Sequence, residues 1–149
     1  MELCVFAPWM QPAATRFFSI CLPASGRTFE PQGRHRALTD LAAHYGDGNC
    51  WCLMEGEEIV GTAAVRALGD EVCELKLMYV LPRCQKKGWG ALLYAKAEEY
   101  ARDRGFRKML LDTLSESRDA IAFYHKRGFV ETERYNGNFH ADVFMEKIL

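Results

Sequence analysis

EVCELKLMYVLPRCQKKGWGALLYAKAEEYARDRG, residues Glu71 to Gly105, reads as a strand, a turn and a long helix. Glu71 to Val80 is the longest strand candidate of the chain, and Pro82 ends its pairing because proline has no N–H for a neighbouring strand. From Gly88 to Arg104 the apolar residues recur at helical spacing, and Gly105 is a typical helix stop. The pattern predicts a helix that opens from a glycine-containing turn at the end of a strand.

The residues after this helix continue the alternation of strands and helices. Lys108 to Thr113 is a short apolar run, which is typical of a strand buried on both faces. A short helix is expected from Ser115 or Ser117 to Gly128. Two last strands are expected, Phe129 to Tyr135 and Phe139 to Ile148, around the Asn136-Gly137-Asn138 turn.

The N-terminal half adds two helices and a hairpin. Helices are predicted over Gln11 to Cys21 and His35 to Tyr45, and the Pro- and Gly-interrupted stretch Leu22 to Gly33 is predicted as a loop. Two β-rich runs, Cys50 to Met54 and Ile59 to Arg66, flank a short polar turn and predict a hairpin. The expected order ααβββαβαββ indicates an α/β fold with a mixed, mostly antiparallel central sheet and helices on both faces.

Length and charge limit the class of protein. A chain of 149 residues with 49% hydrophobic and 26% charged residues fits one globular domain. The net charge of -1 gives no overall positive field that would bind nucleic acid or an anionic membrane. No apolar run approaches the roughly 18 residues of a membrane span, and no secretion signal begins the chain. We expect a cytoplasmic protein without a nucleic-acid or membrane partner, and a homodimer stays open.

The six cysteines are too sparse for a disulfide scaffold and are expected to be reduced. Cys50 and Cys52 would share one face of a strand, but no second Cys or His pair follows at zinc spacing. The four histidines show no metal spacing either. The cysteines are therefore interpreted as small buried side chains, and no metal is expected.

The turn Gln85-Lys-Lys-Gly88-Trp-Gly90 is a candidate anion site. The first N–H groups of a helix have no internal partner and carry partial positive charge, and glycines let a phosphate approach the backbone. Between Arg83 and Lys108 stand eight Lys or Arg and three Asp or Glu. The P-loop pattern GxxxxGK[ST] is absent, and the third glycine of GxGxxG is missing. Charge alone is equally compatible with a phosphate ligand and with a solvated basic helix face.

Three motifs, in one order, resemble the GCN5-related N-acetyltransferases (GNAT family). The pattern Gln85-x-x-Gly88-x-Gly90 is similar to that family's loop for the pyrophosphate of coenzyme A. Cys73 to Pro82 resembles its central strand, and Ala120 to Phe129 resembles its closing helix motif, with a tyrosine ahead of Gly-Phe. The resemblance implies a GNAT-like acyl-CoA N-acyltransferase fold and an enzyme that transfers an acetyl group to a primary amine by direct attack in a ternary complex.

The resemblance also implies acetyl-CoA as co-substrate and a division of the single domain, residues 1–149. Residues 71–129 would form the acetyl-CoA-binding and catalytic core, and residues 1–49 the variable acceptor side. In this family the central strand parts from its neighbour at a bulge, and its freed N–H and C=O groups bind the pantetheine arm. The ligands carried over are Met78, Tyr79, Val80, Gln85, Lys86, Lys87, Gly88, Trp89, Gly90, Ala91, Ser117 and Tyr124. Ser117 stands where many relatives have an asparagine and is only a weak ligand candidate, because a hydroxyl is shorter and lacks the amide's pair of donors.

Three residues are implied in the chemistry by the same resemblance. The Met78 N–H would stabilise the oxyanion of the tetrahedral intermediate. Tyr124 would protonate the departing thiolate, and a phenol with a pKa near ~10 does this only over a short, aligned contact. Glu74 would remove the ammonium proton, because an amine is nucleophilic only when it is neutral. Tyr124 packed on its helix and Glu74 as a solvated strand residue are the alternatives.

The acceptor is predicted only as a class. The residues expected at the thioester end of the cleft are Arg34, His35, Tyr135, Asn136 and Asn138. The stretch from Asp47 to Glu74 has seven Asp or Glu against one Arg, which favours a cationic amine unless it is only a solvated hairpin. Arg34 would instead hold a carboxylate, as an amino-acid acceptor requires.

Two other functions fit part of the pattern. A non-catalytic acyl-CoA-binding or sensing module would keep the loop, but it would need neither Glu74 nor Tyr124. A cysteine hydrolase needs a thiol at a helix N-terminus beside a base, and Cys84 is the one cysteine near such a position.

Overall fold

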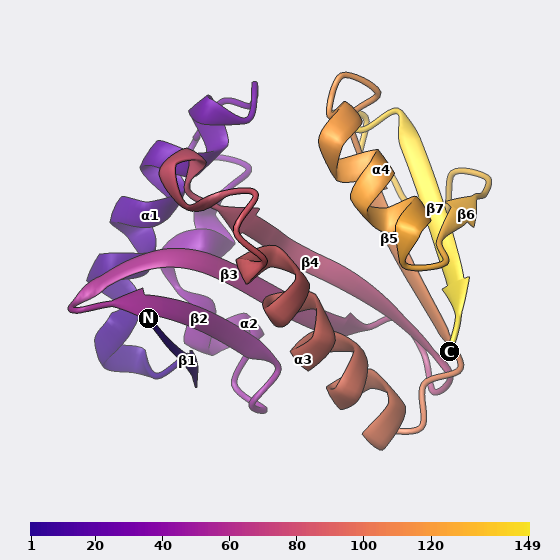
Figure 1. Cartoon of the computed structure of the whole chain (residues 1–149), viewed down its shortest axis with the longest axis horizontal. Coiled ribbons are helices and arrows are strands. Elements are labelled where there is room, and N and C mark those ends of the chain that lie inside the picture. The colour runs from indigo at the N-terminus through magenta and orange to yellow at the C-terminus, as the bar shows by residue number, and fades with distance from the viewer.

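The computed structural model describes all 149 residues and contains one seven-stranded sheet in the order β1-β2-β3-β4-β5-β7-β6 (Figure 1). The strands are β1 (Glu2–Val5), β2 (Cys50–Glu55), β3 (Glu58–Ala67), β4 (Val72–Val80), β5 (Lys108–Thr113), β6 (Val130–Glu131) and β7 (Val143–Ile148). The helices are α1 (Gln11–Ala24), α2 (Leu41–His44), α3 (Trp89–Asp103) and α4 (Arg118–Lys126). Only β4 and β5 run parallel, so the predicted mixed and mostly antiparallel sheet is confirmed.

The two central strands, β4 and β5, pair at one end and then separate. Their register covers Val72 to Glu74 against Lys108 to Leu110, and beyond it the strands diverge (Figure 1). On its other edge β4 stays paired with β3, but the register shifts between Thr62 and Ala64. At this bulge Leu77 has a φ of 56°, in the left-handed region that L residues avoid. A bulge bends its strand, which accounts for an open wedge in the middle of the sheet.

Helices cover both faces of the sheet, with α3 in front of the strands and α1 behind them in Figure 1. On the α3 face, Gly61 lies close to α3: a Cβ there would lie 2.9 Å from the Leu93 Cδ1 atom, and that side chain would have to shift. On the α1 face, the rings of Tyr79 and Phe18 meet edge to face with centroids 6.5 Å apart. A core of 34 buried residues fills the space between these layers. Every helix is too short or too polar to cross a membrane.

The predicted helix from His35 to Tyr45 is wrong. The segment forms a 3-10 turn over Arg36–Thr39 and the single turn of α2, with Asp40 at a φ of -148° between them. The Gln11 side chain enters this break, donating from Nε2 to the Leu38 carbonyl at 2.9 Å and accepting at Oε1 from the Leu41 N–H at 2.8 Å. A side chain distant in sequence therefore replaces the helix's own backbone hydrogen bonds.

Several other boundaries also differ from those predicted. β1 was not predicted, and it pairs with β2 at the sheet edge. α1 continues to Ala24, so the following loop begins at Ser25. The last two strands are shorter than expected, because the loop between them makes its own hydrogen bonds: Arg134 donates to the carbonyls of Asn138 and Ala141 at 2.8 and 3.1 Å.

Candidate active site

A cleft of about 990 Å³ occupies the wedge between the diverging ends of β4 and β5. Its walls are β4 from Glu74 to Val80, the end of β5 from Leu111, and the α4 side chains of Ala120 and Tyr124. The loop after α1 and the loop before β7 contribute further walls. The cleft thus joins the predicted central strand, the closing helix and both predicted acceptor segments.

The end of β4 presents backbone groups to this wedge. The Leu81 N–H donates to the Val60 carbonyl at 2.9 Å, so the backbone of Leu81 faces β3. In an antiparallel ladder every second residue directs its backbone N–H and C=O groups away from the partner strand. By this alternation Met78 and Val80 direct their N–H and C=O groups away from β3, whereas the backbone of Tyr79 faces Thr62 of β3. The Tyr79 side chain, not its backbone, forms part of the cleft wall.

The Gln85 side chain fastens the glycine loop to β4. Its Nε2 donates to the Val80 carbonyl at 2.9 Å, and its backbone N–H donates to Pro82 at 3.2 Å. The first backbone bond of α3 runs from Leu92 to the Gly88 carbonyl, so the N–H groups of Trp89, Gly90 and Ala91 have no partner within the helix. The backbone N–H groups that are free to bind an anion are therefore at the start of α3. The Gln85 backbone and side-chain donors already make hydrogen bonds within the protein.

The loop owes its shape to two residues with positive φ, Lys86 at 60° and Gly88 at 89°. Lys86 and Lys87 are exposed at this position, and Lys86 lies 3.8 Å from the Asp119 carboxylate. Most other cations of the basic stretch point elsewhere and pair with acids: Arg83 with Glu55 and Glu58, Lys96 with Glu99, Arg102 with Glu98, Arg107 with Glu71, and Lys108 with Glu146. The charge excess seen in the sequence does not gather at the loop.

Tyr124 projects from α4 into the cleft wall. Its ring packs edge to face on Phe123 and Phe129, at centroid distances of 5.5 and 5.7 Å. No protein group hydrogen-bonds its hydroxyl. Burial raises the pKa of Tyr124, which keeps the phenol protonated. Ser117, the residue that caps the start of α4, also lines the cleft, and its side chain makes no capping bond.

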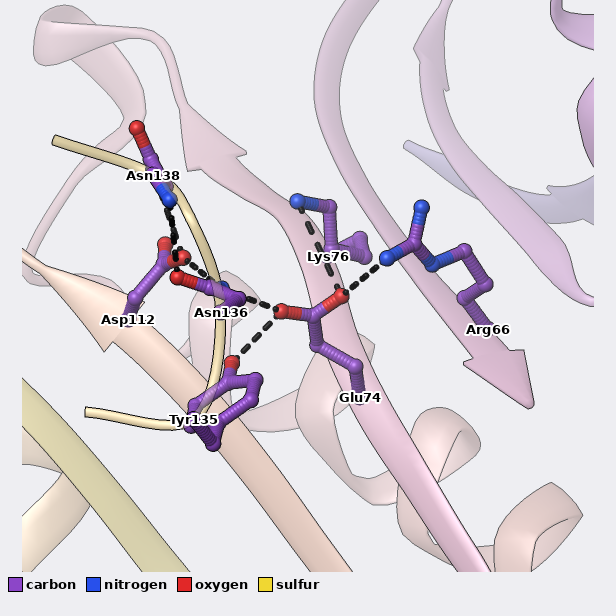
Figure 2. A network of polar contacts seen from close by, with 7 residues as sticks. All are labelled: Arg66, Glu74, Lys76, Asp112, Tyr135, Asn136 and Asn138. Carbon is purple, nitrogen blue, oxygen red and sulfur yellow. Dashed lines mark hydrogen bonds and ion pairs between the residues drawn. The ribbon is translucent and has the colours of Figure 1, made fainter. Parts of the chain in front are cut away.

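Glu74 lies at the closed end of the wedge and exposes 1% of its side chain (Figure 2). Its Oε2 atom accepts from the Tyr135 hydroxyl at 2.5 Å and from Asn136 Nδ2 at 3.4 Å. Its Oε1 atom lies 3.2 Å from Arg66 Nη2 and 3.9 Å from Lys76 Nζ, without a well-aligned hydrogen bond. Burial and then the bond to Glu74 raise the pKa of Tyr135. Glu74 is a buried, paired carboxylate, not a solvated one.

Asp112, at the end of β5, was not singled out from the sequence. Asn136 Nδ2 donates to its Oδ2 atom at 2.7 Å, and Asn138 Nδ2 donates to the same atom at 3.2 Å (Figure 2). Its Oδ1 atom accepts no hydrogen bond from the protein. Asn136 thereby links two carboxylates of the cleft, those of Asp112 and Glu74. No motif contains Asp112, and the apolar run around it indicated only a buried strand.

The loop after α1 contributes both Arg34 and His35 to the cleft wall. Arg34 Nε donates to Glu30 Oε2 at 2.8 Å, so its charge is already paired. His35 accepts the Glu30 N–H at its Nδ1 atom at 2.9 Å. Arg27, not singled out from the sequence, also lines the cleft and bonds only to Ser25.

Six of the seven acids between Asp47 and Glu74 are exposed to solvent, and the seventh, Glu74, is buried. Of these seven acids only Glu74 lines the cleft, so the stretch does not favour a cationic amine. Nowhere do three His, Cys, Asp or Glu side chains converge as a metal-binding group would. All six cysteines are unpaired, and Cys84 lies buried under the loop.

The chain resembles acetyltransferases in sequence. The model of the acetyltransferase (GNAT) family matches residues 13–129. The uncharacterized N-acetyltransferase YjgM of Escherichia coli (strain K12) is 38% identical over 86 residues, 55% of this chain and 52% of that protein. The chain spans about half the length of the curated relatives that it matches.

Solved acetyltransferase structures share the fold. An acetyltransferase from Streptococcus agalactiae 2603 has a TM-score of 0.88 at 19% identity, over 99% of this chain and 98% of that one. An N-acetyltransferase from Thermoplasma acidophilum, solved in complex with coenzyme A, has a TM-score of 0.79 at 17% identity over the same shares. These likenesses confirm the predicted fold class.

Proposed function

The chain belongs to the acetyltransferase (GNAT) family, and we propose that it transfers the acetyl group of acetyl-CoA to a primary amine by direct attack in a ternary complex. Residues 71–129 would carry acetyl-CoA and the chemistry, and residues 1–49 would cover the acceptor. Six unpaired cysteines suit a reducing compartment, so we place the reaction in the cytoplasm. A non-catalytic acyl-CoA sensor is the alternative that the experiments below separate.

Acetyl-CoA would be held in two places, at the start of α3 and along the end of β4. The N–H groups of Trp89, Gly90 and Ala91 at the start of α3 would hold the pyrophosphate, with Lys86 and Lys87 beside them. Met78 and Val80 would pair with the pantetheine arm as a further strand would, in the wedge that β5 leaves open. Because the Val80 carbonyl already accepts from Gln85, its N–H is the more available group, and Gln85 would act by holding loop and strand together.

The transfer requires a proton acceptor, an oxyanion donor and an acid. The amine must lose a proton before attack, and we assign this to Glu74, with water between them because the carboxylate is buried. The Met78 N–H would stabilise the oxyanion that forms on the thioester carbonyl. Tyr124 would then give its proton to the leaving thiolate. A neutral phenol whose hydroxyl has no protein partner is suited to that step.

The observation that carries the proposal is the Tyr124 hydroxyl, which stands without a partner in the same cleft as the free backbone groups of β4. The test measures thermal stability with acetyl-CoA and then thiol release with a panel of primary amines. Stabilisation and release are expected. Stabilisation without release on a broad panel would favour the sensor, and no response to acetyl-CoA or CoA would reject both functions.

A further inference from the structure

Four cationic side chains line the cleft, Arg27, Arg34, Arg66 and Lys76, and three of them are paired. Arg34 pairs with Glu30, and both Arg66 and Lys76 pair with Glu74. Arg27 has no carboxylate partner. Its Nη1 atom donates only to Ser25, to the hydroxyl at 3.0 Å and the carbonyl at 3.4 Å.

Arg27 is held beside the reactive end of the cleft. Its guanidinium carbon lies 5.7 Å from the centre of the Tyr79 ring, and its backbone N–H donates to the Leu22 carbonyl at 2.9 Å. The hydrogen bond to Leu22 holds the Arg27 backbone in place, and the Tyr79 ring supports the guanidinium. A guanidinium in this position has donors left over, because two bonds to Ser25 use only one of its nitrogens.

Asp112 is the matching anion. Two amides fix its Oδ2 atom, no cation pairs with it, and Oδ1 is free. Burial raises the pKa values of Tyr79 and Tyr124, Arg27 lowers both, and Asp112 raises both, so the two charges act on the same pair of hydroxyls. Arg27 and Asp112, which have no ion-pair partner, thus line the same cleft as these two hydroxyls.

We propose that the acceptor is a small molecule that carries a carboxylate next to its amine, such as an α-amino acid, with the carboxylate on Arg27 and the ammonium on Asp112. A guanidinium binds a carboxylate with two parallel hydrogen bonds, and an aspartate oxygen accepts from an ammonium. The assignment concerns binding only and rests on the proposed acetyltransferase function. It replaces Arg34, whose charge Glu30 already neutralises.

The test compares each of the twenty proteinogenic amino acids with its α-carboxamide and with the amine that lacks the carboxylate. We expect at least one amino acid to exceed both counterparts in kcat/KM by roughly 10- to 100-fold, the range of a hydrogen bond between charged groups. Arg27→Gln should remove that preference by raising KM for the amino acid while leaving its amide unchanged. Arg27→Lys should restore part of it, and Asp112→Asn should raise KM for all amines.

Two controls remove similar charges elsewhere. Arg36→Gln deletes a cation of the same loop that bonds to the Gln32 carbonyl and lies outside the cleft, and Asp103→Asn deletes an exposed acid at the end of α3. Neither should change the preference. Acetyl-CoA affinity, measured by calorimetry, should be equal in all variants. A loss of affinity confined to Arg27→Gln would mean that Arg27 binds acetyl-CoA and not the acceptor, which would overturn the assignment.

Failure of the assignment differs from failure of the proposed function. Turnover of amides and simple amines as fast as amino acids, or of peptide N-termini alone, would reject the Arg27 site and leave the acetyltransferase intact. If no amine is turned over, the CoA-loaded protein is titrated with N-acetylated amino acids and their amides. Binding that needs the carboxylate and is lost in Arg27→Gln supports the site, and its absence overturns it.

Discussion

Removing the Tyr124 hydroxyl would remove the proposed acid and leave the ring in its packing against Phe123 and Phe129. Tyr124→Phe should lower kcat on the order of 10²-fold, because general acid catalysis contributes at least that much. Acetyl-CoA affinity should stay nearly unchanged, since the hydroxyl matters chiefly as the thiolate leaves. Tyr100→Phe, at a half-buried tyrosine of α3 outside the cleft, is the control. Equal kcat in Tyr124→Phe and wild type would reject the assignment.

The role of Glu74 can be read from the pH dependence of its amide variant. Without a base, only amine that is already neutral reacts, and this fraction falls about tenfold for each unit below the amine pKa. Glu74→Gln should therefore lose most activity at low pH, where wild type retains it. The measurement is kcat/KM from pH 6 to 9 on one amine. A loss of equal size at every pH would instead make Glu74 an anchor for Tyr135 and Arg66.

Sequence reasoning singled out the candidate site residues that belong to a motif. Met78, Gln85 and Tyr124 line the cleft, and each belongs to a motif that specifies both position and local structure. Arg27 and Asp112 were missed for a physical reason. An arginine in a loop and an aspartate ending a strand are ordinary residues, and their lack of a partner becomes visible only when every neighbouring charge is placed.

At the scale of one helix, α3 offers a matched pair of glycines for testing the loop. Gly88 precedes it at a φ of 89° and Gly105 follows it at 83°, and a Cβ on either would meet no atom. Each Gly→Ala change should cost about 1–2 kcal/mol of stability, because an L residue is strained in this conformation. Only Gly88→Ala should also weaken acetyl-CoA binding, measured by calorimetry, because it disturbs the proposed pyrophosphate donors. Equal affinity in both variants would show that the loop has been misassigned.

The loop after α1 carries a pH-sensitive contact at His35. Burial and then the charge of Arg34 lower its pKa, and its Nδ1 atom must be unprotonated to accept the Glu30 N–H. A lowered folded-state pKa means that protonation favours the unfolded chain, so stability is complete above about pH 6.5 and declines as the pH falls below it. Thermal unfolding between pH 7.5 and 5.5 should show this decline in wild type and less of it in His35→Gln. His44→Gln is the control for loss of an exposed histidine, and identical slopes for wild type and His35→Gln would contradict the prediction.

Whole elements were predictable where one local signal dominated. The hairpin, β5 and α3 agree with their patterns because turn chemistry and apolar spacing act within a few residues. The segment from His35 to Tyr45 has helical spacing too, yet Gln11 interrupts it from another element. β1 has too few residues to show a pattern, and its pairing with β2 depends on the finished sheet.

Across the whole molecule, the sheet consists of two parts, β1–β4 and β5–β7, which are joined by three residue pairs of the β4–β5 ladder. Acetyl-CoA bound in the wedge would bridge the two parts of the sheet. It should therefore slow the hydrogen exchange of backbone amides on both edges of the wedge. Hydrogen exchange followed by mass spectrometry should slow at residues 78–80 and 89–91, and little at 72–74, which are already paired. At a concentration of 100 Kd the added stability is about 2.7 kcal/mol, or a Tm rise of roughly 5–10 °C for a chain of this size. Gly88→Val should lose the protection at both edges. Protection confined to the start of α3 would mean that the pantetheine arm does not lie along β4. The roles proposed for Met78 and Tyr124 would then be rejected.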